Sequence, residues 1–299
     1  MRRVVMILAL LLLIFFGMYH KTGEYISSVY VSEAKLGLVG VSKDSLTFIL
    51  TLVVPNPITL DLKYTSHNFS VYYDDNILAI VNTSSGMLIG GSKNTIIYTG
   101  QLPIEALKEW FYYHASHNWH STFYAKGKIV VEFGPIKAPI YVHSKIEELH
   151  SNPFVEIVNK EFLGQRKDVG YYKLQYPSVK FSKVTWDGKT LRMKITYINN
   201  STSPILIQFP TYEFRANNIL LGTTITDSIL IPGESTVESE IIIDTDTQNI
   251  GKFLLSHFSN GEKTVFELSM EGTIKYLGIT KRGKIFDIKF EYKTHIFSQ

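Results

Sequence analysis

The sequence contains no cysteine among its 299 residues. This absence excludes disulfide bonds, thiolate metal ligands, cysteine nucleophiles and lipidated cysteines, although it does not determine the compartment of the protein. An excess of charge of one sign is also missing, because 30 Lys and Arg residues nearly balance 27 Asp and Glu residues. A net charge of +3, evenly spread, argues against nucleic acid as a partner. No low-complexity tract occurs, so the composition is that of a folded protein.

The sequence also lacks the short motifs that mark most catalytic sites. Residues 37–43 do not have the spacing of a phosphate-binding loop, and no nucleophile elbow or zinc-protease motif occurs. Residues 244–249 begin like a calcium loop but lack its glycine and its final glutamate, so helix capping explains them better. His114, His117 and His120 are closely spaced, and two of them at helical spacing could ligate one metal ion. Since the sequence places no third ligand, we expect no metal site. Because the catalytic motifs are also missing, we expect no cofactor and no catalytic residue.

One long apolar run is present, at the N-terminus. Arg2 and Arg3 precede 16 residues, 4–19, which would span roughly 24 Å as a helix. The arginines predict a cytoplasmic N-terminus with the rest of the chain across the membrane. Residues 15–19 offer no pattern of small residues for signal cleavage. We therefore expect residues 1–23 to be a retained single-pass signal-anchor with extracytoplasmic domains, and a cleaved signal peptide is the alternative.

Four N-x-S/T sequons fit an extracytoplasmic location. Their acceptor residues, which we take as possible glycosylation sites, are Asn68, Asn82, Asn199 and Asn200. Chance occurrence in a chain rich in Ser, Thr and Asn is the alternative explanation.

The hydrophobic pattern is that of β-strands. In residues 46–53, apolar Leu46, Phe48 and Leu50 alternate with residues of the opposite face. Short runs of this kind are separated by turns every 8–12 residues, and one helix per half interrupts them, at residues 104–111 and after residue 247. The pattern predicts a mainly β protein built from antiparallel β-sandwiches of the immunoglobulin or fibronectin-III type, each with one α-helix.

The sequence contains an internal repeat. Five pairs of landmarks recur at spacings of 142 to 145 residues: Asn76 and Asn218, Ile89 and Ile231, Asn56 and Asn200, Gly127 and Gly272, Gly134 and Gly278. We therefore predict two tandem, autonomous sandwiches, at residues 24–144 and 173–299. Between them, residues 151–153 have the capping side chain and the proline of a helix start, so 145–172 is predicted to be a helical connector.

These features together resemble the late-embryogenesis-abundant group 2 family, also called the water stress and hypersensitive response (WHy) domain. The resemblance rests on the strand that ends in Asn56-Pro57, on the turn at 74–77 and on the turn at 90–92 followed by a strand. Ile58 replaces the second Asn of the family's Asn-Pro-Asn, and the second copy, at 199–201, has no proline. The tandem arrangement behind one anchor is similar to membrane-bound desiccation-related proteins of archaea. The resemblance implies a sandwich without catalytic machinery and a role in stress protection, membrane association or lipid contact.

Aromatic residues of the first helix suggest a contact site. Four consecutive aromatic residues, 110–113, cannot all face one core, so we expect Trp110, Tyr112, Tyr113 and Trp119 to contact an amphiphile or a partner. Unit-to-unit packing, the connector or a subunit are alternative covers for this surface. The predicted function is non-enzymatic binding of membrane lipid at the membrane surface. A structural envelope or filament protein, bound to other envelope proteins or to itself, is the alternative.

Overall fold

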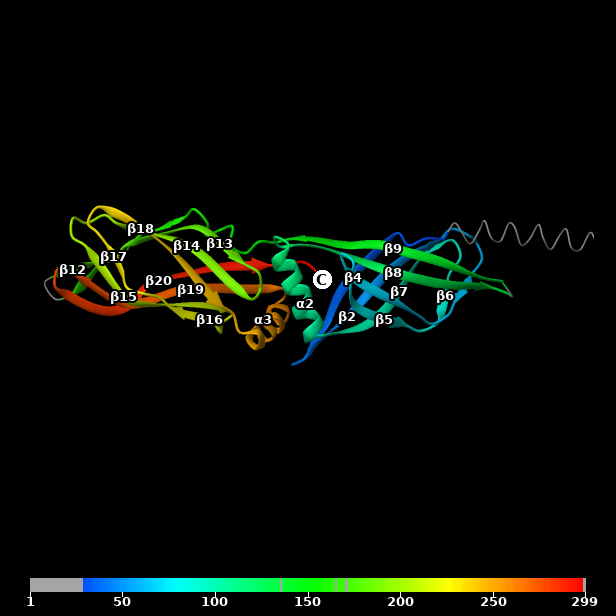
Figure 1. Ribbon diagram of the computed structural model, residues 1–299. Helices are drawn as coiled ribbons and strands as arrows, with labels where there is room; N and C mark the ends of the chain where they lie inside the picture. The colour runs from blue at the N-terminus through cyan, green and yellow to red at the C-terminus, as the bar shows by residue number, and fades with distance from the viewer. Residues whose placement is uncertain (1–28, 135, 165, 170–171, 298–299) are drawn as a thin grey trace, which may run out of the picture.

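The structure is a computed structural model that describes residues 29–134, 136–164, 166–169 and 172–297. These residues form two elongated units placed end to end, and helices α2 (Ile104–Ser116) and α3 (Thr247–Ser259) lie where the units meet (Figure 1). The ladders between the named strands are antiparallel. The predicted anchor, residues 1–23, lies outside the described residues. Within the described part of the chain, no helix has the length and apolar character needed to cross a membrane.

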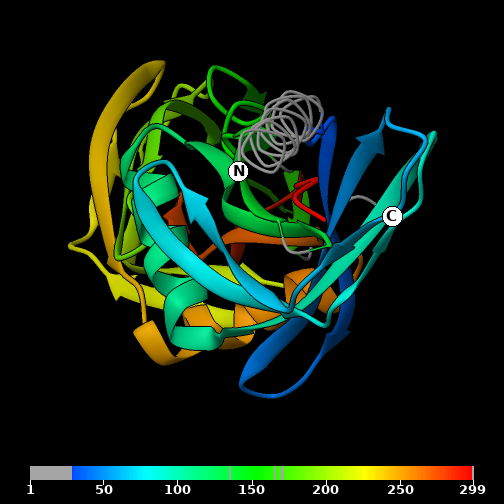
Figure 2. The same ribbon diagram turned by 90° about the vertical axis from the view of Figure 1, so that its right-hand side faces the viewer.

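Unit one, residues 29–150, is built on one continuous nine-stranded sheet. Its strands are β1 (Glu33–Val41), β2 (Ser45–Asn56), β3 (Leu62–Tyr64), β4 (His67–Tyr73), β5 (Asn76–Thr83), β6 (Gly86–Leu88), β7 (Ser92–Pro103), β8 (His120–Phe133) and β9 (Ile136–His150). The order is β1-β2-β7-β5-β4-β8-β3-β6, and β9 pairs with β8. The predicted alternation in β2 is confirmed, because Leu46, Phe48, Leu50 and Leu52 are all buried. Figure 2 shows unit one from its far end, with its blue and cyan strands nearest the viewer.

Unit two, residues 151–297, contains two larger antiparallel sheets that face one another and a separate hairpin. Its strands are β10 (Glu161–Phe162), β11 (Arg166–Val169), β12 (Tyr172–Gln175), β13 (Ser178–Trp186), β14 (Thr190–Asn199), β15 (Ile205–Ala216), β16 (Ile219–Ile225), β17 (Ile229–Ile231), β18 (Ser235–Asp244), β19 (Lys263–Tyr276) and β20 (Ile279–Lys293). One sheet has the order β10-β13-β14-β18; the other has β16-β15-β19-β20, with β17 on β15, while β11 and β12 pair with each other. The hydroxyls of Tyr197 and Tyr212 meet at 2.6 Å between the two larger sheets.

The two units repeat the same hydrogen bonds at a constant spacing of 143 residues. Asn56 and Asn199 each donate from Nδ2 to the carbonyls four and 32 residues further along the chain. Asp74 and Asn217 both have a φ of 47°, and the carboxylate or amide oxygen of each accepts from the amide 48 residues on. The predicted landmark pairs, 142 to 145 residues apart, each miss this register by one or two residues. Asn56, for example, corresponds to Asn199 and not to Asn200.

The predicted connector helix is wrong. Residues 145–150 continue β9, and residues 153–157 form consecutive turns before β10 begins. The side chain of Asn152 does accept a hydrogen bond from the amide of Phe154, at 2.9 Å, but it closes only a turn. Phe154 and Ile157 are 1% and 2% exposed, because both insert into the core of unit two. Tertiary packing of these two side chains therefore overrides the helix-start pattern.

Candidate functional site

The two predicted tryptophans are buried in different places: Trp110 packs within unit one, against His114 and Phe123, whereas Trp119 lies in the seam between the units. Trp110 and Trp119 are 2% and 3% exposed. Phe111 follows Trp110 on α2 and packs against two rings of unit two. Its ring centroid lies 5.2 Å from that of Trp186 and 5.4 Å from that of Phe253. Trp119 also lies 5.9 Å from Trp186. Of the covers considered for this surface, the structure shows two for Phe111 and Trp119: the second sandwich, and Phe154 of the predicted connector, whose ring lies 6.2 Å from that of Trp119.

The seam is continuous with the core of unit two. The ring of Phe154 has four aromatic neighbours in that core, at centroid distances of 5.6–6.4 Å: Trp186, Phe214, Phe266 and Phe290. At the other end of the chain, Phe297 packs against Phe48 of unit one, at 6.1 Å. The amide of Phe297 donates to the buried carboxylate of Glu262, which holds this segment in place. The two units therefore share buried side chains in both directions.

Tyr112 and Tyr113 are half-buried and point to different places. The Tyr112 ring lies 5.4 Å beneath the ammonium of Lys189, and a Cβ at Gly188 would come within 2.5 Å of it. Tyr113 stacks on His117 of its own helix, with centroids 3.9 Å apart. These tyrosines and the two tryptophans thus do not form one exposed aromatic surface.

The three clustered histidines are also separated. His114 is buried and bridges the hydroxyls of Ser121 and Ser151, at 2.8 and 3.2 Å. His257, 143 residues further on, bridges two hydroxyls in the same way. Burial lowers the pKa of His114 to about 4 and that of His257 to about 3, so both imidazoles are neutral and structural near neutral pH. His117 and His120 face away from this buried position.

The sequons occupy two kinds of environment. Asn68 on β4 and Asn82 on β5 are exposed and lie directly opposite each other across the ladder. Asn200 is exposed in the loop after β14. Asn199 is 1% exposed, and its Nδ2 donates to three carbonyls. A glycan on that nitrogen is incompatible with this folded arrangement, whereas the other three side chains reach solvent.

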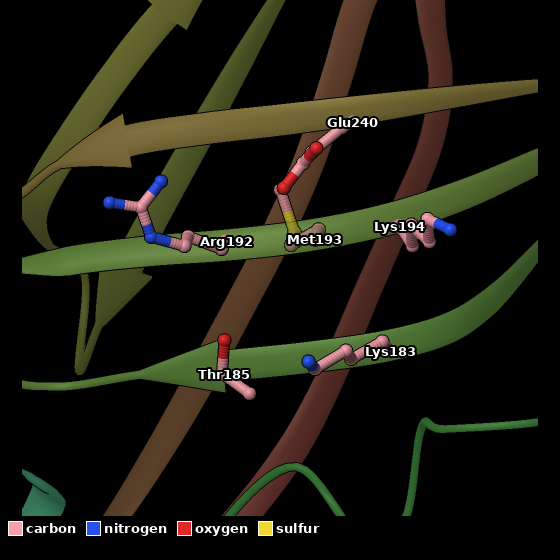
Figure 3. Close-up of a pocket in the computed structure, with 6 residues that line it drawn as sticks. All are labelled: Lys183, Thr185, Arg192, Met193, Lys194 and Glu240. Atoms are coloured by element: carbon pink, nitrogen blue, oxygen red, sulfur yellow. The ribbon is translucent and has the colours of Figure 1, made fainter.

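A basic hollow lies on the outer face of β13, β14 and β18 in unit two (Figure 3). Its volume is about 180 Å³, and its lining consists of Lys183, Thr185, Arg192, Met193, Lys194 and Glu240. Lys183 and Lys194 are direct partners across the ladder of β13 and β14. Glu240 is the partner of Lys194 on the other side, in β18. We call these residues the basic hollow.

The three cations of the basic hollow outnumber its single carboxylate, Glu240, and none of them forms an ion pair with it. Among the described residues, neither Lys183, Arg192 nor Lys194 has a carboxylate within 4.0 Å. Like charges directly opposite each other destabilise a sheet. The arrangement is therefore suited to an anion that bridges the two strands.

The fold itself does not require these charges. At the equivalent positions of unit one, 143 residues earlier, Arg192, Lys194 and Glu240 correspond to Ile49, Thr51 and Ile97. The basic hollow is not among the predicted sites, although Arg192 and Lys194 stand two residues apart in the sequence and therefore on one face of a strand. That Lys183 lies opposite Lys194 depends on the register of β13 against β14, which cannot be read from the sequence.

No protein-family model matches this chain, and no curated protein sequence matches it either. Similar solved structures include a crystal structure of a protein from Archaeoglobus fulgidus, with 15% identity and a TM-score of 0.32 over 44% of this chain and 98% of that chain. The solution structure of AT1g01470 from Arabidopsis thaliana has 13% identity and a TM-score of 0.31 over 40% of this chain and 83% of that chain. The crystal structure of red sea bream transglutaminase has 11% identity and a TM-score of 0.21 over 90% of this chain and 32% of that chain. At these values, the likenesses assign neither a family nor an activity.

Proposed function

We propose that the protein is a non-enzymatic binding module made of two WHy-like, immunoglobulin-type sandwiches and held outside the cytoplasm by residues 1–23. In this proposal, the basic hollow binds the headgroups of anionic membrane lipids, and the resemblance extends the role to desiccation stress. The observation that carries the proposal is the direct opposition of Lys183 and Lys194, with Arg192 beside them, while no described carboxylate lies within 4.0 Å of the three cations and Glu240 is the one acidic residue of the lining.

A lipid headgroup suits this surface for two physical reasons. A phosphate accepts hydrogen bonds from several cations at once, and Arg192 presents a planar fork to it while the lysines act as point charges. The hollow is lined mainly by exposed charged side chains, so it fits a headgroup at a surface better than an acyl chain, which needs apolar walls. The predicted aromatic site is not part of this proposal, because both of its tryptophans are buried.

The test is the replacement of two cations by the residues that unit one has at the same positions, Arg192→Ile and Lys194→Thr. Each Lys or Arg near an anionic membrane surface contributes about 1 kcal/mol to binding, so the double variant is expected to bind about 30-fold more weakly. Binding of residues 29–299 to vesicles with anionic lipid is measured by co-sedimentation. Neutral vesicles are the control, and 0.5 M salt, which shortens the screening length to about 4 Å, is expected to abolish binding of the wild type.

A matched control variant is Lys43→Thr/Lys93→Thr, which removes two exposed cations of unit one. It has the same net charge as the double variant and leaves the basic hollow intact, so its vesicle binding is expected to stay at the wild-type level and to exceed that of the double variant about 30-fold. Equal binding of wild type and double variant to anionic vesicles would rule out the basic hollow as the headgroup site.

A structural role in the cell envelope is the second candidate, and the shared seam favours it. Each unit has strands of 14 residues, such as β8 and β19, which span roughly 46 Å at about 3.3 Å per residue. Two such units joined by a common core make a stiff rod, as an envelope spacer requires (Figure 1). Sedimentation of the full-length protein in detergent tests this role. Discrete oligomers that grow with protein concentration are expected of a filament or layer protein, whereas a monomer at all concentrations contradicts it.

A further inference from the structure

Two histidines and a glutamate meet where β8 begins and β9 ends. His120, the first residue of β8, is the direct partner of His150, the last residue of β9, and their ring centroids are 4.1 Å apart. Glu148 lies two residues before His150 and therefore on the same face of the strand. Its Oε1 is 3.3 Å from Nε2 of His120 and 3.1 Å from Nε2 of His150.

These three atoms have the arrangement of metal ligands. All three lie within 4.8 Å of one another. In a tetrahedral zinc site, bonds of about 2.0–2.1 Å place neighbouring ligand atoms about 3.4 Å apart, close to the two distances from Glu148. The second carboxylate oxygen, Oε2, pairs with Lys145, which orients Oε1 toward the two imidazoles.

Unit two shows what the fold requires at these positions. The residues 143 further on are Lys263, Glu291 and Lys293, and the two lysines are again direct cross-strand partners. The carboxylate of Glu291 pairs with Lys293 at 2.8 Å. A carboxylate between two cations is therefore sufficient to hold the strand ends together, and in unit two both cations are lysines. Protonated lysine cannot bind a metal ion, whereas neutral imidazole can, so unit one has a capacity that unit two lacks.

We propose that His120, Glu148 and His150 form a binding site for Zn²⁺, with water in the remaining coordination positions. Imidazole and carboxylate are ligands that zinc accepts in sites with three protein ligands. The side chains of His120 and Glu148 are about two-fifths exposed and that of His150 is 68% exposed, so the ion reaches the site directly from solvent. The proposal is independent of the lipid-binding function.

The position of the site gives the ion a structural consequence. His150 precedes Ser151, whose amide donates to the carbonyl of Trp119 and whose hydroxyl contacts His114. Trp119 in turn packs on Trp186 of unit two. Zinc would therefore fasten the two strand ends from which the seam is built, and a ligand that binds only the folded state raises its stability.

The experiment compares zinc binding in the full-length protein and in His120→Lys/His150→Lys, which reproduces the cluster of unit two. Protein purified without a histidine tag and freed of metal with a chelator is titrated calorimetrically with zinc chloride at pH 7.5, where most imidazoles are neutral. The wild type is expected to bind one ion per chain at this site and to show a higher Tm with zinc. The double variant is expected to bind at least 100-fold more weakly and to show no such shift. His143→Lys, an exposed histidine of β9 outside the cluster, is the matched control and keeps wild-type binding.

Undiminished zinc binding in the double variant would overturn the proposal, and so would a wild type that binds no more tightly than the variant. A second measurement uses the wild type alone, so it does not depend on whether the double variant folds. In the nuclear magnetic resonance spectrum of the wild type, zinc is expected to shift the imidazole signals of His120 and His150 but not those of His143. Imidazole signals of the cluster that stay unchanged at saturating zinc contradict the assignment.

Discussion

Acidification from pH 7 to pH 5 is expected to lower the free energy of unfolding of this protein by roughly 4 kcal/mol through two buried histidines alone. His114 and His257 hold neutral imidazoles between hydroxyl groups, and burial lowers their pKa to about 4 and about 3. In the unfolded chain both return to a pKa near 6.5. The unfolded state therefore binds up to two more protons than the folded state between about pH 4 and pH 6.5, and the difference is largest near pH 5.

The sign of the effect follows from this difference. The stability that the neutral imidazoles contribute is fully present above about pH 6.5 and is lost progressively as the pH falls toward the folded pKa values. Each histidine contributes a slope of about 1.4 kcal/mol per pH unit within this window. Urea unfolding at a series of pH values measures the combined slope directly.

Substitution of one histidine separates its contribution from general acid denaturation. His257→Gln is expected to be less stable at pH 7, because Gln reproduces the two hydroxyl contacts of His257 imperfectly. Its pH slope, however, should be shallower by about one proton, whatever its absolute stability. The exposed His143→Gln should keep the wild-type slope. An unchanged slope in His257→Gln would show that this imidazole is not neutral in the folded protein.

Phe154→Ala is expected to lower the free energy of unfolding by about 3–5 kcal/mol, the range for removal of a fully buried aromatic side chain. Phe154 is 1% exposed, and its ring fills the space between four aromatic rings at the end of unit two. The neighbouring residue offers a matched control, because Val155 is 69% exposed and Val155→Ala should change stability by less than about 0.5 kcal/mol. Denaturant unfolding followed by tryptophan fluorescence measures both variants.

The same seam predicts how the two units unfold. Because Phe111, Phe154 and Trp119 complete the core of unit two, the whole protein is expected to unfold in one transition. The fragment 173–299, which the duplication alone predicts to fold autonomously, lacks all three side chains. It is expected to be less stable than the intact protein by several kcal/mol. Two separate transitions, or a fragment as stable as the full chain, would mean that the seam carries little energy.

The sequence by itself determined the elements and the repeat. Period-two alternation along residues 46–53 predicted β2, because successive strand side chains point to opposite faces. The helix after residue 247 was predicted from its apolar spacing, and Asp246 caps it by accepting from the amide of Gln248. Such signals are local, so a window of ten residues contains them. The repeat was visible for the same reason, although its register of 143 became clear only from hydrogen bonds that reach 32 residues along the chain.

The tertiary structure decided what covers each element and what lies opposite it. The run 110–113 predicts more aromatic surface than one face of a helix can bury, and only the tertiary structure shows that Trp110 is buried within unit one and Phe111 against unit two. The juxtapositions of Lys183 with Lys194 and of His120 with His150 likewise follow from strand register. A local pattern specifies which side of an element is apolar. The partner of that side, and the residue across the ladder, depend on long-range packing and pairing that no short window of sequence contains.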